Sequence, residues 1–89
     1  MTANVTLPQW TPLEYRILSE LRDANGHTLT ALTLLRRVWG GYTDGTTLRV
    51  HVARMRKKMP AVLRLETVRG YGYKLTGDMT VIDKERERA

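Results

Sequence analysis

The hydrophobic pattern of the chain changes period at Pro60. Before this residue, apolar side chains recur every three or four positions in three separate segments, which is the spacing of a buried helix face. After it, apolar and polar residues partly alternate, which is typical of strands. Because proline breaks a helix interior, the third helical segment must end before Pro60. The predicted order is therefore helix, short extended link, helix, loop, helix and hairpin, within 89 residues that hold one small domain.

Capping residues predict where each helix begins and ends. Thr11 can cap the first helix, Pro12 suits its first position, and Glu14 can close a capping box. This helix should span about residues 12–24 and stop at Asn25-Gly26. Residues of the same types mark the limits of the other two helices. Thr30 can cap the second helix and Gly40-Gly41 can end it, and Asp44 or Gly45 can cap the third helix.

The third helical segment, about residues 46–59, separates apolar from polar side chains. With successive residues 100° apart, one stripe is apolar and holds Leu48, Val52, Met55 and Met59. The opposite side holds Thr46, Val50, Ala53, Arg54 and Lys57. Arg49 and Arg56 flank the stripe, and His51 lies near the edge of the core face. This helix should pack on the core with one side and present cations on the other.

The C-terminal pattern predicts a β-hairpin, with an extended run at 63–68, a turn at 69–72 and a returning strand at 73–75. Three helices followed by a hairpin define an α+β fold, the winged helix-turn-helix. We divide the chain into a winged-helix domain at 1–78 and a charged C-terminal tail at 79–89.

Positive charge is concentrated in the second half of this domain. Residues 36–74 contain ten basic and two acidic residues, whereas the remainder contains five basic and seven acidic ones, for a net charge of +6. Such a region suits a polyanion, because each phosphate that it neutralises releases counterions. The alternative is a solvated basic face with no partner.

Several classes of function lack the residues that they need. There is no cysteine, and His27 and His51 have no ligand cluster around them, so we expect no disulfide, metal or cofactor. Ser19 has no histidine partner at useful spacing, and Gly70-Tyr71-Gly72 lies within a hairpin rather than opening a helix, so we expect no enzyme. With no membrane-length apolar run and no secretory signal, we expect a cytoplasmic protein that does not enter a membrane.

Four segments stand in a distinctive order: Thr11-Pro12-Leu13-Glu14-Tyr15-Arg16-Ile17-Leu18, Leu34-Leu35-Arg36-Arg37-Val38-Trp39-Gly40, Val50-His51-Val52-Ala53-Arg54-Met55-Arg56-Lys57-Lys58-Met59 and Thr67-Val68-Arg69-Gly70-Tyr71-Gly72-Tyr73-Lys74-Leu75. Together they resemble the OmpR/PhoB-type effector domain, the output domain of many two-component response regulators. The resemblance covers about residues 11–75 and implies sequence-specific binding of double-stranded DNA to regulate transcription.

The resemblance also implies a role for individual positions. The third helix matches the recognition helix of the major groove, with Arg54 at a position that can reach base edges beside groove-facing Thr47 and Val50. Arg69 matches the arginine of the hairpin, or wing, that enters the minor groove. Positions that touch the phosphate backbone correspond to Trp39, His51, Arg56 and Tyr73. The loop from Gly41 to Gly45 matches the segment that contacts RNA polymerase in some activators. The predicted DNA-binding set is completed by Thr46, Arg49, Ala53 and Lys57.

Each predicted contact competes with a simpler interpretation. Arg54 could contact guanine O6 and N7 in a bidentate manner, or be a solvated surface arginine. Arg69 either enters a narrow minor groove or marks an ordinary exposed hairpin tip. His51 is a phosphate donor or a half-buried packing residue. For the whole chain, the competing class is a winged helix that binds a partner protein, which would favour an apolar face where Arg54 and Lys57 stand.

Two departures from the family pattern concern the ends of the chain. Family members normally carry a four-stranded sheet before the first helix and a receiver domain; here only Met1 to Trp10 precede the cap of that helix, enough for one strand such as Asn4 to Leu7. The fold class is therefore a winged helix with a reduced N-terminal sheet. That strand and the β-prone stretch Thr80 to Ile82 could pair with a second copy, so we expect cooperative binding to repeated half-sites. The alternative is that the tail folds back and replaces the missing sheet.

Overall fold

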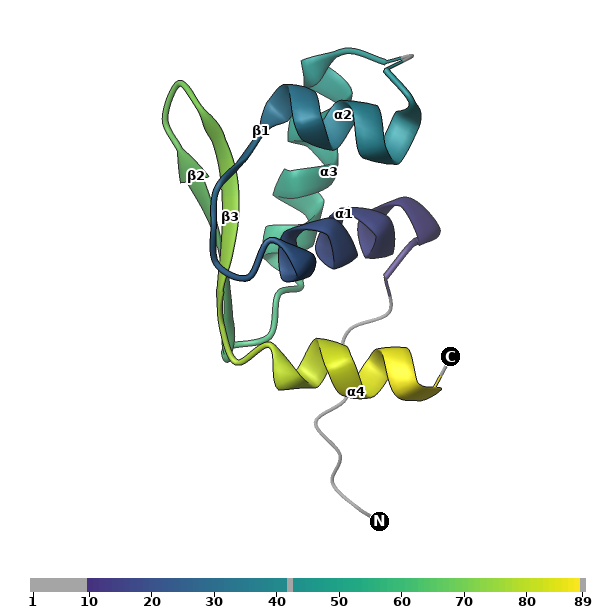
Figure 1. Cartoon of the computed structure of the whole chain (residues 1–89), viewed down its shortest axis with the longest axis vertical. Helices are drawn as coiled ribbons and strands as arrows, with labels where there is room; N and C mark the ends of the chain where they lie inside the picture. The colour runs from purple at the N-terminus through teal and green to yellow at the C-terminus, as the bar shows by residue number, and fades with distance from the viewer. Residues whose placement is uncertain (1–9, 42, 89) are drawn as a thin grey trace.

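The computed structural model describes residues 10–41 and 43–88. In Figure 1, α1 lies between α2 and α4, α3 runs behind α1, and the β-hairpin extends along one flank of the helices. The elements are α1 (Pro12–Asp23), β1 (Leu29–Thr30), α2 (Ala31–Trp39), α3 (Gly45–Lys57), β2 (Leu63–Val68), β3 (Gly72–Gly77) and α4 (Thr80–Arg88). The predicted α+β order of three helices and a hairpin is confirmed, and α4 is an addition to it. The predicted strand from Asn4 to Leu7 lies outside the described residues.

The helix ends fall close to their predicted positions because the capping residues act as expected. The Thr11 N–H donates to Glu14 Oε1 at 3.0 Å, and the Glu14 N–H donates back to Thr11 Oγ1 at 3.2 Å, which completes the capping box of α1. Asp44 caps α3 by accepting from the Thr47 N–H at 3.2 Å. α2 ends at Gly40, whose φ of 70° is a left-handed conformation that glycine adopts without strain.

The hydrophobic core lies where α1, α2 and α3 meet one face of the sheet. Its fully buried side chains come from all of these elements and include Ile17, Leu18, Leu21, Leu34, Met55 and Leu75. The predicted core stripe of α3 is confirmed at Leu48, Val52 and Met55. Met59 is only half-buried, because α3 ends two residues before it. Burial of one face of α3 fixes which of its side chains remain outside.

The hairpin belongs to a three-stranded antiparallel sheet in the order β1-β3-β2. The link predicted as merely extended forms β1, in which Leu29 pairs with Tyr73 and Thr30 with Gly72. A Cβ at Gly72 would lie 1.9 Å from the Leu29 carbonyl oxygen, so glycine is what permits the strands to approach this closely. This contact ties the turn end of the hairpin to the start of α2.

The C-terminal segment differs from its predicted form. Residues 80–88 form α4 instead of a β-prone stretch, and Ile82 is fully buried in the core. Asp83 accepts two hydrogen bonds from the guanidinium of Arg22, both at 2.8 Å, and Arg86 donates to the Ser19 carbonyl oxygen at 3.0 Å. The structure thus shows the tail folded back onto α1, as a helix, while the region that the tail was expected to replace lies outside the described residues. A buried apolar side chain, an ion pair and a hydrogen bond to a carbonyl oxygen outweigh the local β propensity.

Candidate nucleic-acid interface

The exposed side of α3 carries the predicted contact residues on one surface. Opposite the buried stripe, the side chains of Thr46, Arg49, Val50, Ala53, Arg54 and Lys57 are exposed. Val50 is 41% exposed, although valine is usually buried. The structure thus separates a core face from an outer face as the 100° spacing predicted, and the outer face combines cations with small and apolar side chains.

The cations of this surface have no internal partners. Arg49, Arg54, Lys57 and, in the turn between β2 and β3, Arg69 make no ion pair or hydrogen bond through their side chains with another residue that the structure describes. A guanidinium has five N–H donors and an ammonium three, with no acceptor on either. These side chains therefore present donors and positive charge to whatever lies outside the protein.

Arg49 lies beside the hairpin. It lines a hollow of about 320 Å³ together with Ala31 at the start of α2 and residues of β2, the turn and β3, among them Tyr73. Tyr73 is 8% exposed and belongs mainly to the core, and its hydroxyl is the one group of this side chain that can donate a hydrogen bond. The predicted recognition helix and the predicted wing therefore share one concave surface.

Arg56 joins α3 to the sheet. Its Nε donates to the Leu65 carbonyl oxygen at 3.1 Å, and its terminal nitrogen donates to Thr67 Oγ1. The residue is nevertheless exposed, and the guanidinium keeps further N–H donors beyond these two bonds. Arg56 can thus fix the angle between α3 and the hairpin while still offering donors to an anion.

His51 and Trp39 pack edge to face at the other end of this surface. Their ring centroids are 5.4 Å apart at an interplanar angle of 68°, and both residues are half-buried. His51 Nδ1 lies 2.8 Å from the Thr47 carbonyl oxygen, and because a carbonyl only accepts, Nδ1 carries a hydrogen. The remaining nitrogen, Nε2, donates to a phosphate only when the ring is protonated, so packing and phosphate contact by His51 are compatible in that charge state.

An ion pair joins the start of α1 to the end of α3. Lys58 Nζ lies 2.6 Å from Glu14 Oε1 and 5.4 Å from the centroid of the Trp10 ring. Burial raises the pKa of Glu14, but the hydrogen bonds from Lys58 and Thr11 and the nearby positive charge outweigh it, so the pKa lies below its ordinary value. The sequence analysis gave Lys58 no role, since no local signal shows that the start of α1 and the end of α3, which are distant in sequence, meet at this point.

Tyr71 was missed by the sequence analysis. It lies in the wing turn between Gly70 and Gly72, and 58% of it is exposed, the largest fraction among the exposed large apolar side chains of the described residues. An aromatic side chain between two glycines, two positions after Arg69, was the available signal. Its exposed ring lies on the same turn as the arginine of the predicted wing.

A known protein family matches most of the chain. Residues 6–75 match the family described as "Transcriptional regulatory protein, C terminal". The chain belongs to this family. The predicted OmpR/PhoB-type effector domain is thereby confirmed, and the family supports the DNA-binding interpretation over that of a protein-interaction module. It is a family of transcription regulator domains and not of enzymes.

Curated relatives are considerably longer than this chain. The transcriptional regulatory protein CseB of Streptomyces coelicolor is 48% identical over 67 residues, which cover 73% of this chain and 28% of CseB. The sensory transduction protein RegX3 of Mycobacterium tuberculosis is 43% identical over 79 residues, covering 82% and 34% of the two chains. The phosphate regulon transcriptional regulatory protein PhoB of Rhizobium meliloti is 44% identical over 71 residues, covering 72% and 30%. The chain thus spans about a third of the length of these relatives.

Two solved structures share the fold. The DNA-binding domain of Bacillus subtilis CssR superposes with a TM-score of 0.68 at 30% identity, over 76% of this chain and 78% of that one. The DNA-binding domain of the response regulator AdeR, solved in complex with an intercistronic region, gives 0.68 at 29% identity, over 78% and 74%. These similarities confirm the winged-helix fold.

Within residues 10–41 and 43–88, no group of three or more histidine, cysteine or acidic side chains is placed to hold a metal ion. In the same part of the chain, no helix has both the length and the apolar composition needed to cross a bilayer.

Proposed function

We propose that this chain is a sequence-specific transcriptional regulator that binds double-stranded DNA, with α3 in the major groove and the turn between β2 and β3 in the minor groove. The observation that carries the proposal is the group of cations without internal partners on α3 and the wing, in a chain of this family. The major groove is wide enough for an α-helix, and arginine matches the O6 and N7 acceptors of guanine.

Positions on this surface divide into base-reading and backbone-binding roles. Arg54 reads guanine, and the neighbouring Thr46, Thr47, Val50 and Ala53 contact base edges and thymine methyl groups. Arg49 alters the sequence preference from the hollow beside the wing. Arg69 enters the minor groove. Phosphates are contacted by Lys57, Arg56, protonated His51, the Trp39 indole and the Tyr73 hydroxyl, since most protein–DNA hydrogen bonds position the protein rather than specify the sequence.

We also propose two further partners, RNA polymerase and other copies of this chain on DNA. The loop from Gly41 to Gly45, of which Tyr42 lies outside the described residues, contacts RNA polymerase, and two or more copies bind repeated half-sites cooperatively. Residues 80–82 do not serve as an edge strand for a second copy, because they belong to α4 and Ile82 is buried in the core. Residues 1–78 form the DNA-binding unit, and α4 supports it from the side of α1. We propose a cytoplasmic location for a protein with this function.

Selection of bound sequences from random duplexes tests the function. The full chain, immobilised through its N-terminus, should enrich a defined motif containing guanine, and the enriched duplex should bind with higher affinity than the starting pool. Specific sites are typically bound at least about a thousandfold more tightly than random DNA, although one small module achieves less than a dimer. Failure to enrich any motif, with the chain shown to be folded, would contradict sequence-specific binding.

A further inference from the structure

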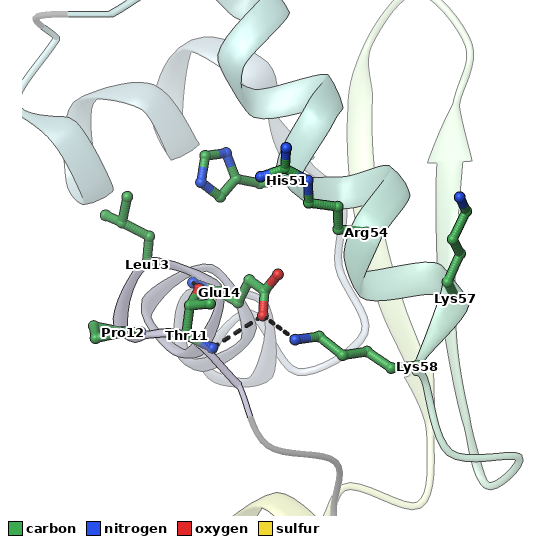
Figure 2. A pocket seen from close by; sticks show the side chains of 8 residues that line it. All are labelled: Thr11, Pro12, Leu13, Glu14, His51, Arg54, Lys57 and Lys58. Carbon is green, nitrogen blue, oxygen red and sulfur yellow. Dashed lines mark hydrogen bonds and ion pairs between the residues drawn. The ribbon is translucent and has the colours of Figure 1, made fainter.

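A second hollow lies between the start of α1 and the C-terminal half of α3. It has a volume of about 710 Å³ and is lined by residues from the start of α1 and from α3 and its C-terminal end: Thr11, Pro12, Leu13, Glu14, His51, Arg54, Lys57 and Lys58. This volume is in the range of small-molecule sites. In Figure 2 the side chains of Leu13 and His51 face each other across the hollow, while Lys57 points away toward the hairpin.

One end of the hollow is closed by fixed polar contacts. Glu14 accepts hydrogen bonds from Lys58 Nζ at 2.6 Å and from the Thr11 N–H at 3.0 Å, and its side chain is 3% exposed. Figure 2 shows both contacts converging on the same carboxylate. The negative charge of Glu14 is therefore compensated within the wall, and the two helices are held at a fixed separation. The hollow is formed before any ligand arrives.

The unpaired groups around the hollow are donors and positive charge. Arg54 has no side-chain hydrogen bond or ion pair with another described residue. The first turn of α1 also has a free donor. The capping box uses the backbone N–H groups of Thr11 and Glu14, and proline at position 12 has no N–H. The Leu13 N–H therefore has no partner among the described residues. The positive end of the α1 helix dipole adds to the positive potential at this end of the helix. Pro12 and Leu13 supply apolar surface beside these donors.

We propose that this hollow binds a small organic anion, a carboxylate on an apolar body, and that the bound anion competes with DNA. The carboxylate contacts Arg54 and the start of α1, and the apolar body packs on Pro12 and Leu13. Competition rests on the proposed function, because Arg54 cannot contact a ligand in the hollow and a guanine at the same time. DNA binding by this chain thus acquires an effector site within the interface itself.

A heteronuclear NMR titration of the full chain with octanoate tests the site directly, with acetate as the matched anion that lacks the apolar body. Octanoate should shift the amide signals of residues 11–14 and 51–58 in a saturable way and bind at least about tenfold more tightly than acetate, because each buried methylene adds affinity. Equal binding of octanoate, acetate and inorganic phosphate would mean that the hollow binds anions without selecting an apolar body, and it would overturn the proposal. Absence of saturable shifts would do the same.

Two variants and a DNA measurement complete the test. Arg54→Ala should weaken octanoate binding several-fold, whereas Arg64→Ala, which removes an exposed arginine of β2 outside the hollow, should leave it unchanged. In fluorescence anisotropy, octanoate should lower the affinity of the wild-type chain for a duplex more than acetate at the same ionic strength. Octanoate binding without an effect on DNA affinity would overturn the competition. A wild-type chain that binds no duplex would contradict the proposed function, while the NMR titration would still decide the site.

Discussion

Arginine and lysine side chains are used in opposite ways on two faces of the molecule. On the face of α1 and α4, Arg22 pairs with Asp83 at 2.8 Å and Arg86 pairs with Asp23 at 3.0 Å. On the outer face of α3 and the wing, Arg54, Lys57 and Arg69 have no such partner among the described residues. The same residue types thus hold the fold together on one face and remain available to an external anion on the other. Net charge alone does not distinguish the two uses, but the position of the acidic side chains does.

The largest expected effect concerns the supporting face. Ile82→Ala should lower the free energy of unfolding by about 2–5 kcal/mol, because it removes a fully buried side chain from the core. Urea denaturation followed by circular dichroism measures this change. Lys84→Ala, an exposed position on the same helix, is the matched control and should change stability by less than about 0.5 kcal/mol. Equal effects of the two substitutions would mean that α4 does not pack on the core in solution.

A smaller effect is expected on the open face. Arg54→Ala should weaken binding to the preferred duplex by about 1–3 kcal/mol and relax base preference at one position, whereas Lys57→Ala should weaken all sequences alike. Neither should alter stability much, because neither side chain has a partner within the described part of the fold. Competition binding with single-base variants of the duplex separates the two roles. Unchanged base preference in Arg54→Ala would remove this residue from base reading.

The smallest effect lies where the two faces meet, at Glu14 and Lys58. Because the pKa of Glu14 is lowered in the folded state, the pair contributes stability that is fully present above the unfolded pKa. This contribution is lost as the pH falls through the folded pKa. Glu14→Gln should therefore reduce stability at pH 7 by about 1 kcal/mol and make the difference from the wild type shrink in acid. Urea denaturation at pH 7 and at pH 3 measures the stability difference between Glu14→Gln and the wild type. A difference that is larger at pH 3 than at pH 7 would contradict a lowered pKa of Glu14 in the folded state.

How far the sequence predicts this molecule depends on how local each determinant is. Thr11, Asp44 and Gly40 act on adjacent turns, so the helix limits followed from them. The outer face of α3 followed from helical periodicity. The pairing of Lys58 with Glu14 and the hydrogen bonds of Arg56 to β2 depend on how distant elements cross, and no periodicity encodes that. The C-terminal segment shows the same limit. Its β-prone residues form α4 because Ile82 is buried in the core and Asp83 pairs with Arg22 of α1, and both contacts are with residues distant in sequence.

The salt dependence of DNA binding tests most directly whether the two faces differ as described. Fluorescence anisotropy of a labelled duplex across a salt series gives the slope of log Kd against log salt concentration for each variant. Lys57→Ala should lower this slope by about 0.9, the value for one lost phosphate contact. Arg22→Ala, which removes a cation already paired with Asp83, should leave the slope unchanged provided that circular dichroism shows a folded chain. Equal changes in the two variants, or a change only in Arg22→Ala, would contradict the assignment of the DNA-binding face to α3.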